Sequence, residues 1–183
     1  MTKFDSNKTL RQLMQELLLT GDYFVKREIQ KQESFYYGDH AIVHDPDGKI
    51  RNLLDKDEVE KRVQNYEYII KFIKNLSPNS VLDLGCGLGD MLINLNEVKY
   101  RTGVDSDVRF AQKRSDLVKW IEKDVELFDD LGDHECIICH HVIEHLSSPV
   151  KFIKRIYNRM DRNSILIIGT PDFDSGAARL FDK

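Results

Sequence analysis

The 183-residue sequence has few residues that cross-link a chain or break its secondary structure, namely three cysteines and four prolines. It also has only one tryptophan. An odd number of cysteines is a poor framework for disulfide bonds and disfavours a small secreted scaffold. No apolar run approaches the roughly 20 residues that a membrane-spanning helix needs. The first ten residues, MTKFDSNKTL, also lack the apolar core of a signal peptide. We therefore expect a cytoplasmic protein with no membrane partner.

The charge balance lacks the basic excess that is typical of nucleic-acid-binding proteins. The formal net charge is -4, with 32% charged and 41% hydrophobic residues. A molecule of this charge does not attract nucleic acid through its overall field. The length suits one domain with a real core and a small appendage. We therefore expect a small-molecule substrate and no nucleic-acid partner.

The cysteine pair Cys136 and Cys139 has C-x-x-C spacing, but it lies in the apolar run CIIC, which predicts a strand. Residues an odd number of positions apart on a strand point to opposite faces of the sheet. The two thiols therefore cannot share a metal ion, and we expect ordinary buried cysteines.

The first 55 residues differ from the rest of the chain. Leucine and methionine residues between Leu10 and Leu18 recur at helical spacing and predict an amphipathic helix. Residues 22–55 show no regular pattern, but DPDG at 45–48 is a strong turn signal. We expect residues 1–55 to form a helical extension that serves as a lid, or as a dimer contact through its helix.

From residue 56 onward, helical and strand patterns alternate. After a helix that starts at Asp57 and ends before Pro78, the chain predicts strands at 80–85, 100–105, 117–124, 135–140 and 164–170, and helices at 90–96, 106–114 and 148–160. Short, continuous apolar strands that alternate with helices predict a parallel sheet covered on both faces. The expected fold class is therefore α/β, a Rossmann-like doubly wound sheet over residues 56–183.

The turn after the first of these strands carries the clearest chemical signal. In VLDLGCGLGD, the glycines Gly85, Gly87 and Gly89 allow a sharp bend and close approach of the backbone to a ligand. Asp105 ends the next strand, twenty residues after Gly85, where a carboxylate accepts hydrogen bonds from ribose hydroxyls. Together these features predict a site for a nucleoside-bearing cofactor.

The glycine spacing G-x-G-x-G differs from the G-x-G-x-x-G of nicotinamide enzymes. With GVDSD, Asp124, HHVIEHL and ILIIGTPDF following in order, the sequence over about residues 57–183 resembles class I S-adenosylmethionine-dependent methyltransferases, including quinone-pathway O-methyltransferases. The resemblance implies S-adenosylmethionine as cofactor. It places the cofactor among Asp83, Gly85, Cys86, Gly87, Gly89, Asp105, Ser106, Asp124, Val125 and the backbone near His140.

That family has a seven-stranded sheet, whereas this chain ends at TPDFDSGAARLFDK, soon after the fifth strand. We therefore expect five strands in the order 3-2-1-4-5, without the C-terminal strands of the family. The edge left open would be covered by a partner chain, as in a homodimer, or by Phe173 and a terminal helix.

The segment HHVIEH at 140–145 holds the candidates for catalysis. His145, then His141, is the predicted base or substrate contact, with Glu144 beside them. Two alternatives stay open: the Glu144–His145 pair ties loops together, or His141, Glu144 and His145 bind a divalent ion. The metal-using relatives carry an acidic residue where His141 stands, so we expect no metal.

Fold alone does not name the methyl acceptor. The segment GTPDFDSGAARLF resembles methyltransferases of polysaccharide and secondary-metabolite biosynthesis, which favours oxygen methylation of a sugar or sugar-nucleotide. The alternatives are a metal-assisted RNA 2'-O-methyltransferase and a non-catalytic module that binds cofactor for interaction.

Overall fold

The computed structural model describes residues 41–44 and 50–170. The chain divides into two compact units, Met1–Val59 and Glu60–Lys183. The predicted N-terminal helix, Phe173 and the predicted C-terminal helix lie outside the described residues. Within the described part, no helix is long and apolar enough to cross a membrane.

In the first unit, strands β1 (Ile42–His44) and β2 (Ile50–Asn52) form an antiparallel pair with His44 opposite Ile50. Our expectation that residues 22–55 are irregular was therefore wrong for these six residues. The strands are three residues each, too short for a period-2 pattern to stand out from the surrounding sequence. The turn signal at 45–48 lies between the paired strands, outside the described residues.

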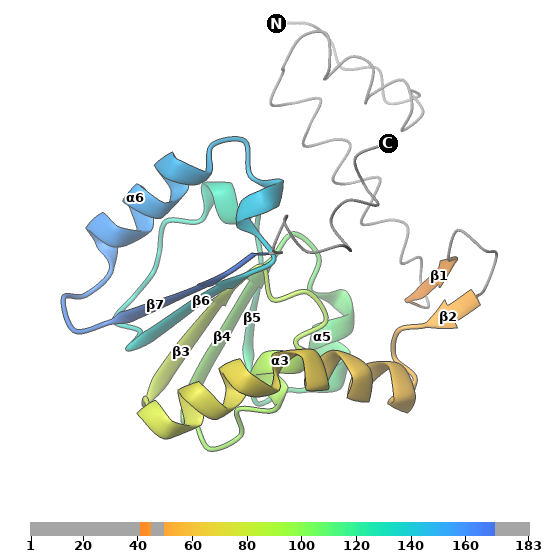
Figure 1. Cartoon of the computed structure of the whole chain (residues 1–183). Coiled ribbons are helices and arrows are strands. Elements are labelled where there is room, and N and C mark those ends of the chain that lie inside the picture. The colour runs from red at the N-terminus through yellow and green to blue at the C-terminus, as the bar shows by residue number, and fades with distance from the viewer. Residues whose placement is uncertain (1–40, 45–49, 171–183) are drawn as a thin grey trace, which may run out of the picture. The chain divides into compact units, whose positions relative to one another are not determined.

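The second unit is built on a five-stranded parallel sheet, as predicted (Figure 1). Its strands are β3 (Ser80–Leu84), β4 (Tyr100–Asp105), β5 (Lys119–Glu122), β6 (Cys136–His140) and β7 (Ile165–Gly169). They lie side by side in the order β5-β4-β3-β6-β7. This numbering differs from the predicted 3-2-1-4-5 because the hairpin strands β1 and β2 precede the sheet. Counted from β3, the neighbours are the third, second, first, fourth and fifth strands.

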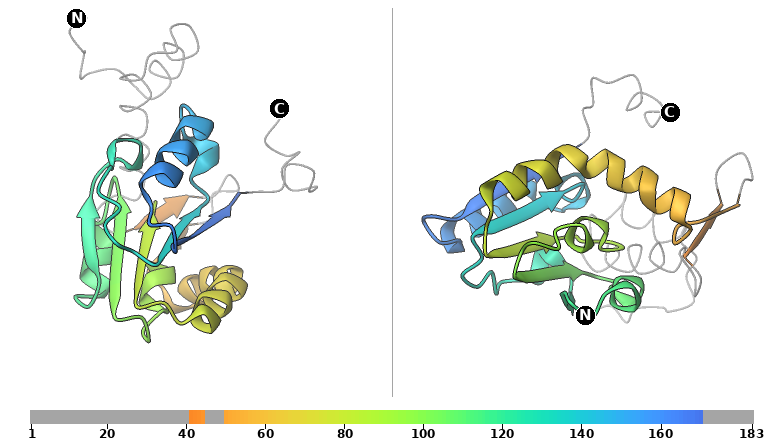
Figure 2. Two further views of the ribbon diagram at one scale, coloured as in Figure 1. Left: turned by 90° about the vertical axis from the view of Figure 1, so that its left-hand side faces the viewer. Right: turned by 90° about the horizontal axis from the view of Figure 1, so that it is seen from below.

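Helices cover both faces of this sheet, α3 on one side and α6 on the other (Figure 2). The helices are α3 (Lys56–Leu76), α4 (Asp90–Ile93), α5 (Arg109–Arg114) and α6 (Pro149–Arg159), with short 3-10 turns η2 (Val125–Leu127) and η3 (Ile143–His145). The predicted helices at 90–96 and 106–114 are shorter than expected. Val98 and Leu95, which follow α4, are buried in the core, so tertiary packing extends beyond the helical turn.

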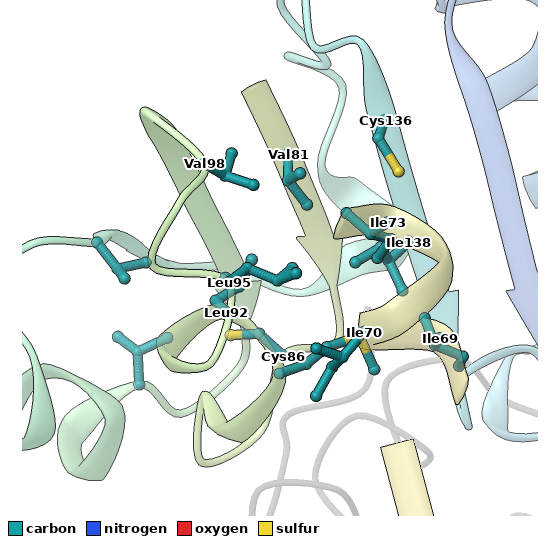
Figure 3. Close-up of a cluster of buried hydrophobic side chains, with 13 residues drawn as sticks. Ile69, Ile70, Ile73, Val81, Cys86, Leu92, Leu95, Val98, Cys136 and Ile138 are labelled. Carbon is teal, nitrogen blue, oxygen red and sulfur yellow. The ribbon is translucent and has the colours of Figure 1, made fainter. Parts of the chain in front are cut away.

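The core has two apolar layers, one on each face. The layer against α3 contains Ile69, Ile70 and Ile73, which pack with Val81 and Ile138 from the sheet (Figure 3). The layer against α6 contains Phe152 and Ile156 with Leu82, Leu84 and Ile137. Alternate residues of β3 enter opposite layers, as the period of a strand dictates. Because all five strands are parallel, their carboxyl ends lie together at one edge of the sheet, where a ligand is expected.

Candidate cofactor and acceptor site

The glycine turn after β3 is a tight loop in which three residues adopt positive φ: Gly85 (φ 82°), Gly87 (φ 51°) and Gly89 (φ 79°). A side chain is strongly disfavoured in this left-handed region. The amides of Gly85 and Cys86 donate to the Val104 carbonyl at 2.7 and 3.1 Å. The turn is therefore tied to β4 by its own backbone.

The surroundings of the three glycines explain their different roles. A Cβ on Gly85 would come within 2.3 Å of Val142, and a Cβ on Gly89 within 2.4 Å of the Trp120 ring. These two glycines are required for packing. A Cβ on Gly87 would meet no atom within 4 Å, so this glycine borders open space. The turn therefore presents a free surface at its middle residue, as a bound ligand requires.

Asp105 joins the turn to the end of β4. Its Oδ2 accepts a hydrogen bond from the Gly87 amide at 2.8 Å, and its Oδ1 accepts from the Asp107 amide and the Ser106 hydroxyl at 3.2 and 3.3 Å. Burial raises the pKa of Asp105, while these hydrogen bonds oppose the rise. The structure thus brings together Gly87, Asp105 and Ser106, three of the predicted cofactor residues.

Asp83 is the second carboxylate at this edge, and its side chain is buried. Burial, reinforced by the nearby charge of Asp105, raises the pKa of Asp83 to about 7. No hydrogen bond to its carboxylate occurs within the described part of the chain. A cationic group at this place would favour ionisation and lower the pKa again. A buried carboxylate, Asp83, and a half-buried one, Asp105, beside an open glycine turn suit the positively charged methionine end and the ribose of S-adenosylmethionine.

The turn after β5 carries the residues predicted to flank adenine. The Asp124 carboxylate caps η2 by accepting from the Glu126 amide at 2.8 Å. The Val125 carbonyl accepts from Arg155 of α6 at 2.9 Å, and the Val125 side chain packs against the α6 layer. Both residues fix the conformation of this turn, and the structure places the turn at the carboxyl end of β5, next to β4.

The segment after β6 holds the predicted catalytic residues. His141 adopts φ 55°, and its Nδ1 lies 3.2 Å from Glu144 Oε1. The Glu144 side chain is 10% exposed, and its Oε2 is buried with no hydrogen-bond partner among described residues. His145 is exposed at the end of η3, and the described hydrogen bonds include none from its ring. Glu144 thus pairs with His141, whereas one alternative left open by the sequence was a Glu144–His145 pair.

His140 is a packing residue at the end of β6. Its ring contacts Tyr66 edge-on, with 5.4 Å between ring centroids, and lies over Gly169, where a Cβ would meet it at 2.1 Å. Burial, followed by the nearby His141, lowers the pKa of His140 and so favours its neutral ring. His140 therefore links α3, β6 and β7 beside the predicted pocket.

All three cysteines are free and buried. Cys136 lies in the α3 layer and Cys139 in the α6 layer, which confirms that they point to opposite faces. Burial raises the pKa of Cys136 to about 11 and that of Cys139 to about 12. No group of three or more potential metal ligands occurs within residues 41–44 and 50–170.

Several residues around the turn escaped the sequence analysis. Trp120 covers Gly89 and Gly103, Val142 covers Gly85, and Asp90 forms ion pairs with Arg62 and Arg114. Asp90 immediately follows the glycine motif, which was an available signal. No pattern in the sequence marked Arg62 and Arg114, because only the folding of α3 and α5 brings them to the turn.

A glycine turn, a carboxylate on the next strand and an open carboxyl-end edge define a nucleoside-binding α/β domain of Rossmann type. The profile of the family described as methyltransferase domain matches residues 49–183. The chain therefore belongs to this family, the class I S-adenosylmethionine-dependent methyltransferases, and S-adenosylmethionine is the cofactor that the family uses.

Two curated relatives are ubiquinone biosynthesis O-methyltransferases. The protein of Rickettsia bellii (strain OSU 85-389) is 26% identical over 115 residues, which covers 56% of this chain and 48% of that protein. The protein of Rickettsia prowazekii (strain Madrid E) is 24% identical over 159 residues, which covers 79% and 59%. The chain thus spans about half the length of the curated relatives it matches.

Solved structures agree on the fold. The plantazolicin methyltransferase BpumL, in complex with a pentazolic desmethylPZN analog and SAH, has a TM-score of 0.57 at 18% identity and covers 95% of this chain and 65% of that one. The methyltransferase domain of bacterial CtHen1-CN has a TM-score of 0.55 at 21% identity and covers 66% and 73%.

Proposed function

We propose that this chain transfers the methyl group of S-adenosylmethionine to a hydroxyl oxygen of a small molecule, with a sugar or sugar-nucleotide as the preferred acceptor. One observation carries the proposal: Asp105 holds the Gly87 amide at 2.8 Å, while the space above Gly87 is open. A preformed turn with a free surface and a charged neighbour suits an adenosyl ligand at the carboxyl ends of the strands.

When bound, S-adenosylmethionine supplies an electrophilic methyl group on a sulfonium. The residues of this chain bind and orient it. We assign Asp105 to the ribose hydroxyls, with Ser106 as its support, and Asp83 with the turn from Gly85 to Gly89 to the methionine end. Asp124 and Val125 shape the turn assigned to adenine. Methyl transfer is an in-line displacement, so this positioning supplies most of the rate enhancement.

A hydroxyl acceptor must also lose a proton, and we assign the removal of that proton to His141. When the Nδ1–H of His141 donates to Glu144 Oε1, at 3.2 Å, the lone pair of its Nε2 is free to accept a proton. The carboxylate of Glu144 then stabilises the cationic ring that forms, as the third group of a catalytic triad does. Glu144 Oε2, buried without a described partner, is available for an O–H or N–H donor of the acceptor.

The choice of oxygen is supported by the curated relatives, which are named as O-methyltransferases. The sugar acceptor is supported by the resemblance of residues 169–181 to enzymes of polysaccharide biosynthesis. The negative net charge of -4 favours a small acceptor over RNA, which carries the same sign of charge.

The first test is cofactor binding by calorimetry, with S-adenosylmethionine, its demethylated product and NAD as ligands. We expect the first two to bind and NAD to fail, and binding of NAD alone would refute the assignment. The second test measures transfer of a labelled methyl group to sugar-nucleotides, catechols, primary amines and short RNA. Labelling confined to amines or to RNA would contradict the proposed acceptor.

A further inference from the structure

A largely buried ion cluster adjoins the glycine turn. Asp90 follows the last glycine of the motif and is 4% exposed. Its Oδ2 lies 2.6 Å from Nε of Arg62 on α3, and its Oδ1 lies 2.6 Å from Nη1 of Arg114 on α5. The two arginine side chains are 21% and 18% exposed, so the cluster is largely shielded from solvent.

Arg114 also contacts the turn directly. Its Nη1 donates a hydrogen bond of 2.6 Å to the carbonyl of Leu88, the residue between Gly87 and Gly89. Asp105, at the end of β4, accepts a hydrogen bond of 2.8 Å from the amide of Gly87. Two consecutive residues of the turn are therefore held by side chains at the ends of α5 and β4.

We propose that Arg62, Asp90 and Arg114 are positioning residues that hold the glycine turn in its cofactor-binding conformation. This inference rests on the proposed cofactor site, which it deepens by naming the residues that fix its shape. Asp90 continues the turn into α4. Its Oδ2 accepts a hydrogen bond from Arg62, and its Oδ1 forms an ion pair with Arg114. The peptide between Gly87 and Gly89 consequently has little freedom to rotate.

The physical reason is the low tolerance of a buried charge. A carboxylate at 4% exposure is stable only when it is paired, so removal of one arginine forces Asp90 to move toward water or toward the remaining partner. Asp90 is covalently joined to Gly89, and the backbone of the turn must move with it. A displacement of about 1 Å at a binding loop is enough to weaken ligand interactions severely.

The main variant is Arg114→Met, which keeps the apolar stem and removes both contacts. We expect it to weaken S-adenosylmethionine binding about tenfold or more while the protein remains folded. Arg62→Lys retains a positive charge for Asp90 and should retain most of the affinity, whereas Arg62→Met should not. Lys74→Met is the matched control, because Lys74 also joins α3 to the segment after α4, through Glu97 at 2.9 Å, without touching the turn.

Ile73→Val changes a core residue of α3 away from the turn. It shows how far a general loss of stability, without a change at the turn, affects the affinity for the cofactor. If Arg114→Met loses affinity and Ile73→Val keeps it at an equal loss of melting temperature, positioning is supported. Unchanged affinity in a folded Arg114→Met protein overturns the inference.

A second readout needs no cofactor. The Gly89 amide donates to the Cys86 carbonyl at 2.9 Å, so its hydrogen exchange reports on the turn itself. We expect exchange at Gly89 to accelerate about tenfold or more in Arg114→Met, relative to core amides of β3, and to stay unchanged in Lys74→Met. If the native protein binds no S-adenosylmethionine, the proposed function fails, yet this exchange experiment still decides the inference. Equal exchange in native and Arg114→Met protein would refute it.

Discussion

The turn after β3 and the segment after β6 lie at the same edge of the sheet, but they are built differently. In the first, the Gly87 amide and the Leu88 carbonyl are held by Asp105 and Arg114, and two glycines are covered by Trp120 and Val142. In the second, Glu144 Oε2 is buried without a described partner, and His141 adopts φ 55°. The proposed cofactor end is preformed, whereas the proposed acceptor end keeps a non-glycine residue at positive φ and an unpaired acceptor atom, which are features of functional sites.

Substitution of Gly89 should have the largest effect, because it breaks the preformed turn. In Gly89→Ala the new Cβ would lie 2.4 Å from the Trp120 ring, at φ 79°. We expect a loss of about 2–5 kcal/mol in the free energy of unfolding from overpacking and backbone strain. Chemical denaturation measures this loss, and the fluorescence of the single tryptophan reports it locally.

Gly87→Ala is the matched control for this prediction. It also places alanine at positive φ, but its Cβ meets no atom within 4 Å. It should cost only about 1–2 kcal/mol of backbone strain. Equal destabilisation by the two variants would show that contact with Trp120 does not restrict the turn.

The next largest effect concerns the segment after β6. His141→Asn keeps a residue that tolerates positive φ and removes the proposed base. We expect the rate of methyl transfer to a hydroxyl acceptor to fall about a hundredfold or more, with the Kd of S-adenosylmethionine unchanged. Single-turnover kinetics with labelled cofactor separates the two quantities. His145→Asn is the control, and a larger loss in that variant would return the role of base to His145.

Asp105→Asn tests the hydrogen bonds that we propose between the Asp105 carboxylate and the ribose hydroxyls of the cofactor. The amide oxygen can still accept from Gly87, but the charge that strengthens bonds to ribose hydroxyls is lost. We expect affinity for S-adenosylmethionine to fall roughly tenfold to a hundredfold. Calorimetry with cofactor analogues that lack the 2' and 3' hydroxyls of the ribose gives the cross-check. If those analogues lose no affinity in native protein, Asp105 does not hold the ribose.

The smallest effect is a pH dependence that arises from Asp83. Its pKa is raised to about 7, so the group is protonated in the unliganded protein below that pH and ionised above it. A cationic ligand favours the ionised form, so its binding must release a proton at low pH. Affinity should therefore fall about tenfold as pH drops by one unit below 7. Binding titrations from pH 5.5 to 8.5 measure the slope.

Asp83→Asn should remove this slope, since the amide does not titrate. For the unliganded protein the sign is opposite. A carboxyl whose pKa is raised on folding stabilises the fold at low pH, and that contribution is lost as pH rises from the ordinary carboxyl range through about 7. An identical pH slope of binding in native and Asp83→Asn protein would assign the dependence to another group.

The sequence predicted the fold well where strands are buried on both faces. Continuous apolar runs such as VLDL and CIIC have few alternatives once helical patterns alternate with them. It failed at the hairpin of β1 and β2, where three residues a strand leave no readable period, and it overestimated the length of α4. Short elements are selected by tertiary contacts, which no local pattern records.

The candidate site likewise has residues that could be predicted from the sequence and contacts that could not. Gly85, Gly87, Gly89 and Asp105 could be found from the sequence because their roles are backbone conformation and strand-end position, which spacing encodes. The pairing of Glu144 with His141 could not be assigned in the same way. Their separation of three residues suits a helical turn, but the sequence did not show that a turn forms here, as η3 does.

What the amino-acid sequence determined by itself is the alternation of buried strands with helices and the place of the glycine turn in it, since both follow from local rules of periodicity and backbone freedom. Which side chains hold that turn was decided by the tertiary structure. Asp90, Arg62 and Arg114 are distant in sequence, and they meet only because helices packed on the same sheet bring opposite charges out of water together.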